Sequence, residues 1–125
     1  MKPLVKATEN QFQVIVPDET RRLSDVLDQV KMLETMVWYN RHQIKLERLE
    51  NGEVKVVEPH EASLNPGRLI PKDIWVQAKK AAKEAENTFG LENLGPWDSF
   101  DMGMIKGKLS ALRWIMGSEW DDLDT

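Results

Sequence analysis

The chain has 125 residues, a formal net charge of −4 and no cysteine. A chain of this length is typical of one domain and can bury roughly two-thirds of its unfolded surface. The lack of cysteine excludes disulfides, thiolate metal ligands and a thiol nucleophile. Because neither half of the chain has an excess of cations, nucleic acid is not an expected partner.

The amino-terminal residues do not have the pattern of a targeting segment. They lack the apolar stretch of about 7–15 residues that a signal peptide carries. No apolar run approaches the ~20 residues that span a bilayer. We therefore expect a soluble, cytoplasmic protein with one domain over residues 1–125, an acidic tail at 118–125 and no membrane partner.

The first 17 residues are predicted to be extended. Two apolar runs, residues 4–7 and 11–16, flank a short polar segment that suits a hairpin turn. A helix is then predicted over about residues 19–41, because apolar residues recur there at steps of three and four. These residues are Leu23, Val26, Leu27, Val30, Leu33 and Val37.

Residues 42–57 fit two structures. The first helix can continue until Gly52 ends it, or the segment can form a hairpin on the Asn51-Gly52 turn. We favour the hairpin, although it places Glu50 opposite Glu53, which repel each other. Residues 54–57 form a strand under either interpretation.

The second half of the chain is predicted to hold two further helices. Prolines and a glycine over residues 59–71 indicate a loop, after which a helix with an alanine-rich stripe runs from Pro71 to Gly90. A third helix is predicted over about residues 98–116, with Gly117 ending it.

The third helix is apolar almost all round, which is typical of a buried helix. We therefore expect it to be central, with the side that carries Gly103 and Gly107 against the alanine stripe. The predicted fold is an α-rich α+β domain. It has three main helices around the third, and a small antiparallel sheet from residues 4–16 and 54–57.

Two alternative functions have candidate residues. Glu47, Glu50, Asp98 and Asp101 form two pairs at i, i+3 spacing. Pairs of this kind on neighbouring helices hold Mg²⁺ in all-helical nucleotide pyrophosphohydrolases. If the first helix continues, a second group shares one face and suits phosphate contacts of a nucleic-acid accessory factor. Its members are Arg41, Lys45 and Arg48. Neither histidine has a metal-ligand spacing.

The carboxyl-terminal segment supplies the preferred hypothesis. Trp38, Trp75 and Trp114 are predicted to be core residues, whereas Trp120 lies in an acidic tail. Trp120 either folds back over the core or anchors a partner, because tryptophan is enriched among residues that dominate binding energy. The carboxylates near it would steer association with a basic partner.

We thus expect a non-enzymatic interaction or regulatory protein that binds another protein or itself. No catalytic residue, metal ligand or cofactor is assigned. The predicted contact residues are Arg113, Trp120, Asp121, Asp122 and Asp124.

The same segment resembles the carboxyl terminus of a group of small bacterial proteins. The shared features are the run Gly-Lys-Leu-Ser-Ala-Leu-Arg-Trp at residues 107–114 and the acidic end around Glu119-Trp120-Asp121. The resemblance covers the last quarter of the chain and implies that the tail is a native terminus. It brings no activity or catalytic residues with it.

Overall fold

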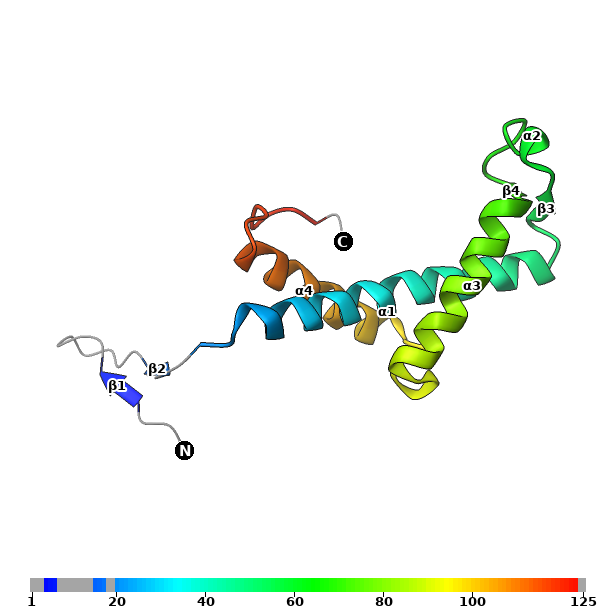
Figure 1. Ribbon diagram of the computed structural model, residues 1–125. Coiled ribbons are helices and arrows are strands. Elements are labelled where there is room, and N and C mark those ends of the chain that lie inside the picture. Colours follow the sequence, from blue (N-terminus) through cyan, green and yellow to red (C-terminus); the bar gives the residue numbers. More distant parts are fainter. Residues whose placement is uncertain (1–3, 7–14, 18–19, 124–125) are drawn as a thin grey trace.

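A computed structural model describes residues 4–6, 15–17 and 20–123, the first two segments as backbone only. The described part is mostly helical (Figure 1). Its elements in chain order are β1 (Leu4–Lys6), β2 (Ile15–Pro17), α1 (Leu23–Glu50), β3 (Lys55–Val57), α2 (Pro59–Ala62), β4 (Leu69–Pro71), α3 (Lys72–Phe89), the 3₁₀ turn η1 (Leu91–Asn93) and α4 (Ser99–Ile115).

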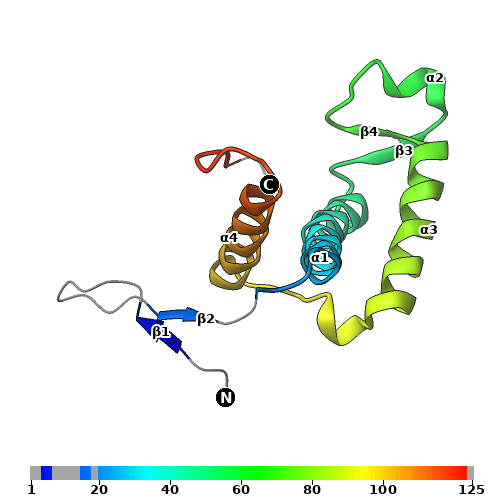
Figure 2. The same ribbon diagram turned by 60° about the vertical axis from the view of Figure 1, so that its left-hand side comes forward.

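The central helix is α1 and not α4. Figure 2 looks almost along α1 and shows α4 on one side of it and α3 on the other. The prediction that the third long helix is central is therefore wrong. The buried residues of α4 are Ile105 and Leu109, whereas Gly103 and Gly107 are exposed. The sequence of α4 is apolar on two sides, but only one of these sides packs against another helix, α1.

The predicted α+β fold with one small antiparallel sheet is also wrong. β3 pairs with β4 in parallel, with Val56 opposite Ile70. β1 and β2 form a separate antiparallel pair, with Val5 opposite Val16. β4 lies in the segment predicted as loop, and its apolar run is only three residues long. The pairing is parallel because residues 58–68 lead the chain from the end of β3 back to its start, where β4 begins.

α1 is 28 residues long and continues through the segment for which a hairpin was favoured. Asn51-Gly52 ends this helix instead of turning a hairpin. Gly52 has a φ of 78°, its N–H donates to the Leu49 carbonyl at 3.2 Å, and the Glu53 N–H donates to the Arg48 carbonyl at 2.9 Å. This is a Schellman motif, which favours a glycine with positive φ. A hairpin turn on Asn51-Gly52 would favour glycine at the same position.

The boundaries predicted for α3 and α4 are confirmed. α3 begins directly after Pro71 and ends before Gly90. Asp98 caps α4, because its Oδ1 accepts the Asp101 N–H at 2.7 Å. Gly117, with a φ of 112°, ends α4 in a second Schellman motif: its own N–H donates to the Trp114 carbonyl, and the next N–H donates to the Arg113 carbonyl.

Two apolar clusters hold the helices together. The larger joins α1 to α3 and α4 and consists of Val30, Leu33, Met36, Val37, Tyr39, Ala82, Ala85, Leu94, Ile105 and Leu109. The smaller joins the end of α1 to α3 and the β3–β4 pair and consists of Val54, Ile70 and Trp75. Of the tryptophans predicted to be core, Trp75 is buried, while Trp38 and Trp114 are 37% and 51% exposed.

The packing of α4 on α1 predicts unequal effects at two apolar positions of the same helix. Leu109 is 1% exposed and Met104 is 49% exposed. We expect Leu109→Ala to lower the free energy of unfolding by about 2–5 kcal/mol, because it leaves a cavity in the core. Met104→Ala should change it by no more than ~0.5 kcal/mol. Urea denaturation of both variants checks this, and equal losses would contradict the orientation of α4.

Candidate functional site

The most unusual surface of the described chain is the side of α4 that points away from α1. We define the outer face of α4 as Phe100, Gly103, Met104, Gly107 and Trp114. Their spacing of three, four and seven residues places them on one side of the helix. Phe100 is 75% exposed, and Met104 and Trp114 are about half exposed. Large apolar side chains gathered on one exposed face mark interaction sites more often than isolated ones do.

The two glycines of the outer face have no packing role within the chain. A β-carbon added at Gly103 or Gly107 would meet no atom within 4 Å. Both have ordinary helical backbone, since neither has a positive φ. Each glycine nevertheless costs the helix about 1 kcal/mol relative to alanine. The fold of the single chain therefore does not require either residue.

The carboxyl-terminal segment folds back beside the outer face. The turn at Gly117 reverses the chain, so that the Trp120 ring lies edge-on to the Trp114 ring at 5.3 Å between centroids. The Ser110 hydroxyl donates to the Asp122 carbonyl at 3.4 Å. Trp120 remains 69% exposed. The tail therefore rests on α4 and enlarges its exposed aromatic surface, instead of covering the core.

The predicted contact residues fall into three groups. Trp120, Asp121 and Asp122 are exposed and lie together on this turn. Arg113 is half-buried and forms an ion pair with Glu34 of α1 at 3.8 Å, so its charge already has a partner inside the chain. Asp124 lies outside the described residues.

The carboxylates proposed for Mg²⁺ do not converge. Among the described residues there is no group of three or more His, Cys, Asp or Glu side chains that could hold a metal ion. Glu47 and Glu50 lie near the end of α1, whereas Asp98 and Asp101 lie at the start of α4, where Asp98 serves as the cap. The four carboxylates therefore lack the arrangement that the hydrolase hypothesis requires.

The basic strip on α1 is partly neutralised. Arg41, Lys45 and Arg48 do share a helix face, because α1 continues to Glu50. Arg48 forms an ion pair with Glu53 at 3.2 Å. The strip is therefore less cationic than its sequence indicates.

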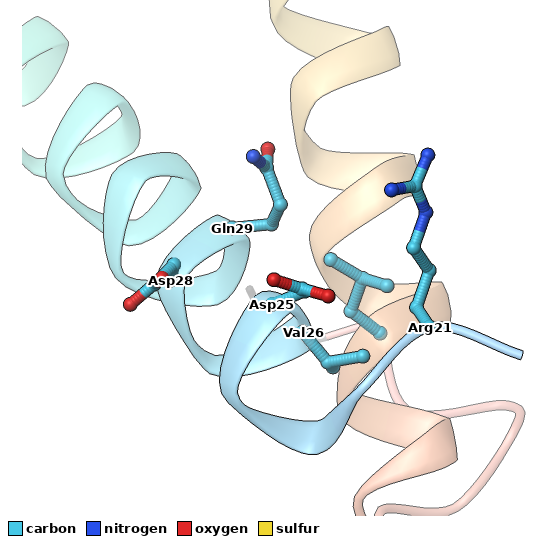
Figure 3. Close-up of a pocket in the computed structure, with 6 residues that line it drawn as sticks. Arg21, Asp25, Val26, Asp28 and Gln29 are labelled. Carbon is cyan, nitrogen blue, oxygen red and sulfur yellow. The ribbon is translucent and has the colours of Figure 1, made fainter.

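A surface hollow of about 340 Å³ lies between the start of α1 and α4 (Figure 3). Its lining includes Arg21, which precedes α1, Asp25 and Asp28 of α1, and Leu112 of α4. Figure 3 shows Asp28 directed away from Arg21. The three charged side chains are exposed to water, so we assign no ligand to this hollow.

His42 is a buried polar residue whose environment the sequence did not reveal. It is 7% exposed and stacks between Trp38 and Trp75, with ring centroids 5.2 Å away on each side. Burial is the main cause that lowers the pKa of His42, with a contribution from the charge of Lys45, while the charge of Glu86 opposes it. The i, i+4 spacing of Trp38 and His42 was the available signal, but Trp75 comes from α3.

Tyr39 lies beside His42 and ties α1 to α3. Its hydroxyl donates to Oε2 of Glu86 at 2.7 Å. Burial and the hydrogen bond to Glu86 raise the pKa of Tyr39. His42 and Tyr39, whose pKa values are shifted, therefore lie at the α1–α3 contact and not on the outer face of α4.

Comparison with known protein families, with curated proteins and with solved structures finds no match to this chain. Within the described residues, none of the helices combines the length and the apolar character needed to traverse a bilayer.

The empty space at the glycines predicts a stability gain. We expect Gly107→Ala to raise the free energy of unfolding by up to about 1 kcal/mol at low protein concentration, because alanine favours the helix. Gly117→Ala is the matched control and should destabilise the protein, because Gly117 has a φ of 112°. Urea denaturation measures both, and a loss at Gly107 would show that the single chain needs this glycine.

The lowered pKa of His42 predicts a pH dependence. The folded protein binds fewer protons at His42 than the unfolded chain, whose histidine has a pKa of about 6.5. Stability is therefore lost as the pH falls through that value towards the folded pKa. We expect the urea midpoint to drop between pH 7.5 and pH 5.5.

The control for this prediction uses the second histidine. His42→Gln should flatten the pH dependence of the urea midpoint, even if the midpoint itself is lower. His60→Gln is the matched control for the loss of one histidine, because His60 lies in α2, outside the α1–α3 contact. An unchanged slope in His42→Gln would contradict the assignment to His42.

Proposed function

We propose that this protein acts by binding another protein, without catalysing a reaction, through the outer face of α4 and the adjoining turn at residues 117–122. The observation that carries the proposal is the exposure of Phe100, Met104 and Trp114 on one side of α4, together with Trp120 on the adjoining turn. Aromatic side chains exposed along one helix face do not stabilise a monomer, whereas their burial against a partner would stabilise a complex.

The chemistry of the surface suits a partner with an apolar groove or ridge and a basic rim. Tryptophan contributes large contact area and is enriched at the centre of interfaces. Asp121 and Asp122 lie at one end of the surface and are exposed. Their charges would orient a basic partner and speed its association. We also place this activity in the cytoplasm, which suits a chain without cysteine.

The location of the titratable groups supports a binding role over catalysis. Active sites shift the pKa values of groups that face a substrate. Among the described residues, His42 and Tyr39 have shifted pKa values, and both lie in the contact between α1 and α3, where they stack or hydrogen-bond with their neighbours. These contacts stabilise the packing of α1 on α3 and do not point to a catalytic role for His42 or Tyr39.

Affinity capture tests the proposal. Full-length protein is immobilised and exposed to native host lysate, beside a variant carrying Phe100→Ser and Trp120→Ser. We expect the captured protein, once purified, to bind the variant at least about 30-fold more weakly, because each aromatic anchor contributes on the order of 2 kcal/mol. Circular dichroism confirms that the variant is folded.

The matched control is Leu64→Ser. Leu64 is 81% exposed and lies between α2 and β4, outside the proposed surface. It should bind like the parent protein. If the serine variants of the α4 surface retain every captured protein at parental affinity, this surface is not the binding site.

A further inference from the structure

The rings of Trp114 and Trp120 meet at an angle beside the end of α4, and we call the space between them the indole corner. We propose that the indole corner binds the guanidinium group of an arginine that a partner protein presents. This inference rests on the proposed function, because it names the chemical group that this end of the surface recognises. It follows from the angle and exposure of the rings, from the turn that holds them and from the charges beside it.

The two indole rings stand almost at right angles. Their planes are inclined by 79° and their centroids are 5.3 Å apart. A cation that rests about 4 Å from both planes in such a corner lies within about 6 Å of both centroids, the range over which a ring face attracts a cation. Two rings stacked face to face would cover each other, and a cation outside the stack would reach one ring. The angle between the rings therefore points to a positively charged ligand.

The indole corner is open to water. Trp114 is 51% exposed and Trp120 is 69% exposed. In an edge-on contact the ring that contributes its edge keeps both of its faces clear of its neighbour. Trp75 differs in both respects, because it is 7% exposed and its ring is stacked on His42. A cation in solution can therefore reach the indole corner, whereas the ring of Trp75 is covered.

Hydrogen bonds hold the turn that carries Trp120. The Asp122 N–H donates to the Glu119 carbonyl at 3.2 Å. This bond closes a turn with Trp120 and Asp121 at its centre. The hydroxyl of Ser110 on α4 donates to the Asp122 carbonyl at 3.4 Å and ties the turn to the helix. Because the corner is already formed in the single chain, binding removes less conformational freedom than it would from a flexible tail.

The charges near the corner favour a cation over an anion. Glu119 and Asp121 are the direct neighbours of Trp120 in the sequence, and both are exposed. Residues 117–123 contain no lysine or arginine. The nearest cation in the sequence, Arg113, forms an ion pair with Glu34 of α1. A positive group in the corner thus meets aromatic faces and a negative potential together, whereas the same carboxylates would repel an anion.

The shape of the site fits arginine better than lysine. A guanidinium group is planar, can lie flat on an indole face and is more weakly hydrated than an ammonium group. The N–H groups at its edge remain free to donate to a carboxylate. Exposed cation–π contacts and exposed ion pairs are each weak. We therefore expect a single arginine side chain to bind with a dissociation constant on the order of 10–100 mM.

NMR spectroscopy of the full-length, 15N-labelled protein tests the site. The chain has five tryptophans and hence five indole N–H signals, and Trp114→Phe and Trp120→Phe assign the two that matter. N-acetyl-arginine methylamide, added up to about 200 mM at matched ionic strength, should shift these two signals in a saturable way and by more than the other three. The lysine derivative should need at least about 3-fold higher concentration for the same shift.

The matched control ligand is the citrulline derivative, which has the shape of arginine without its charge. It should leave the signals of Trp114 and Trp120 almost unchanged. Equal shifts with arginine and citrulline would show that the corner binds without regard to charge, and would overturn the inference. Equal affinity for arginine and lysine would overturn the assignment to a guanidinium group.

Substitutions separate the roles of the ring and of the charge. Trp120→Leu keeps an apolar side chain but removes the ring, so it should abolish the arginine-dependent shift of the Trp114 signal. Asp121→Asn should weaken arginine binding by about 2- to 3-fold at low salt, because the loss of one exposed charge has a small effect. Leu64→Ser, outside the surface, should bind arginine like the parent. Parental affinity in Trp120→Leu would place the arginine elsewhere and contradict the inference.

The outcomes distinguish this inference from the proposed function. If arginine moves neither signal, yet Phe100→Ser with Trp120→Ser still abolishes capture of another protein, the indole corner is not a cation site and the proposed function stands. If arginine moves both signals but no captured protein depends on the α4 surface, the cation site stands, while the proposed function and the partner protein as the source of the arginine are both wrong.

Discussion

The packing of Leu109 and Ile105 of α4 against α1 decides which side of α4 is exposed to water. Leu109 is 1% exposed and belongs to the same cluster as Val30 and Leu33 of α1. Successive residues of a helix are turned by about 100°, so two inward side chains determine the direction of all the others. With Leu109 inside, Gly107 and the rest of the outer face must point into water. A rotation of α4 about its own axis would bury the glycines and expose the leucine, at the loss of a large apolar area.

The length of α1 allows one helix to organise two clusters of different chemistry. Its first half packs on α4 through aliphatic side chains, and its second half meets α3 and the β3–β4 pair. Aromatic and polar contacts accompany the second contact: His42 stacks between Trp38 and Trp75, and Tyr39 donates to Glu86. Burial favours the neutral imidazole, because the charged form would lose its hydration. The lowered pKa of His42 is the reason why we expect acid to weaken the α1–α3 contact.

The residues on the outer face of α4 lower the stability of the single chain, and the proposed binding role supplies a reason for them. Gly103 and Gly107 weaken the helix, and exposed Phe100 and Trp114 add apolar surface to water. Natural sequences depart from the locally favoured residue mainly where function requires it. The Schellman turn at Gly117 brings Trp120 against Trp114, so the aromatic surface is already formed in the single chain. Preformed side chains lose less conformational freedom on binding than those of a flexible tail.

The local features of this protein could be predicted from the sequence, because their causes lie within a few residues. The cap at Asp98, the stop at Gly117 and the extent of α3 between Pro71 and Gly90 belong to this class. The hairpin favoured for residues 42–57 was wrong, since Asn51-Gly52 suits both a hairpin turn and a helix end, and β3 pairs with β4 instead of with residues 44–50. The central place of α1, the stacking of His42 on Trp75 and the exposure of the glycine side of α4 were decided by tertiary contacts. An apolar pattern indicates which side chains are suited to burial. The element that covers them lies far away in the sequence, and only tertiary packing decides which element it is.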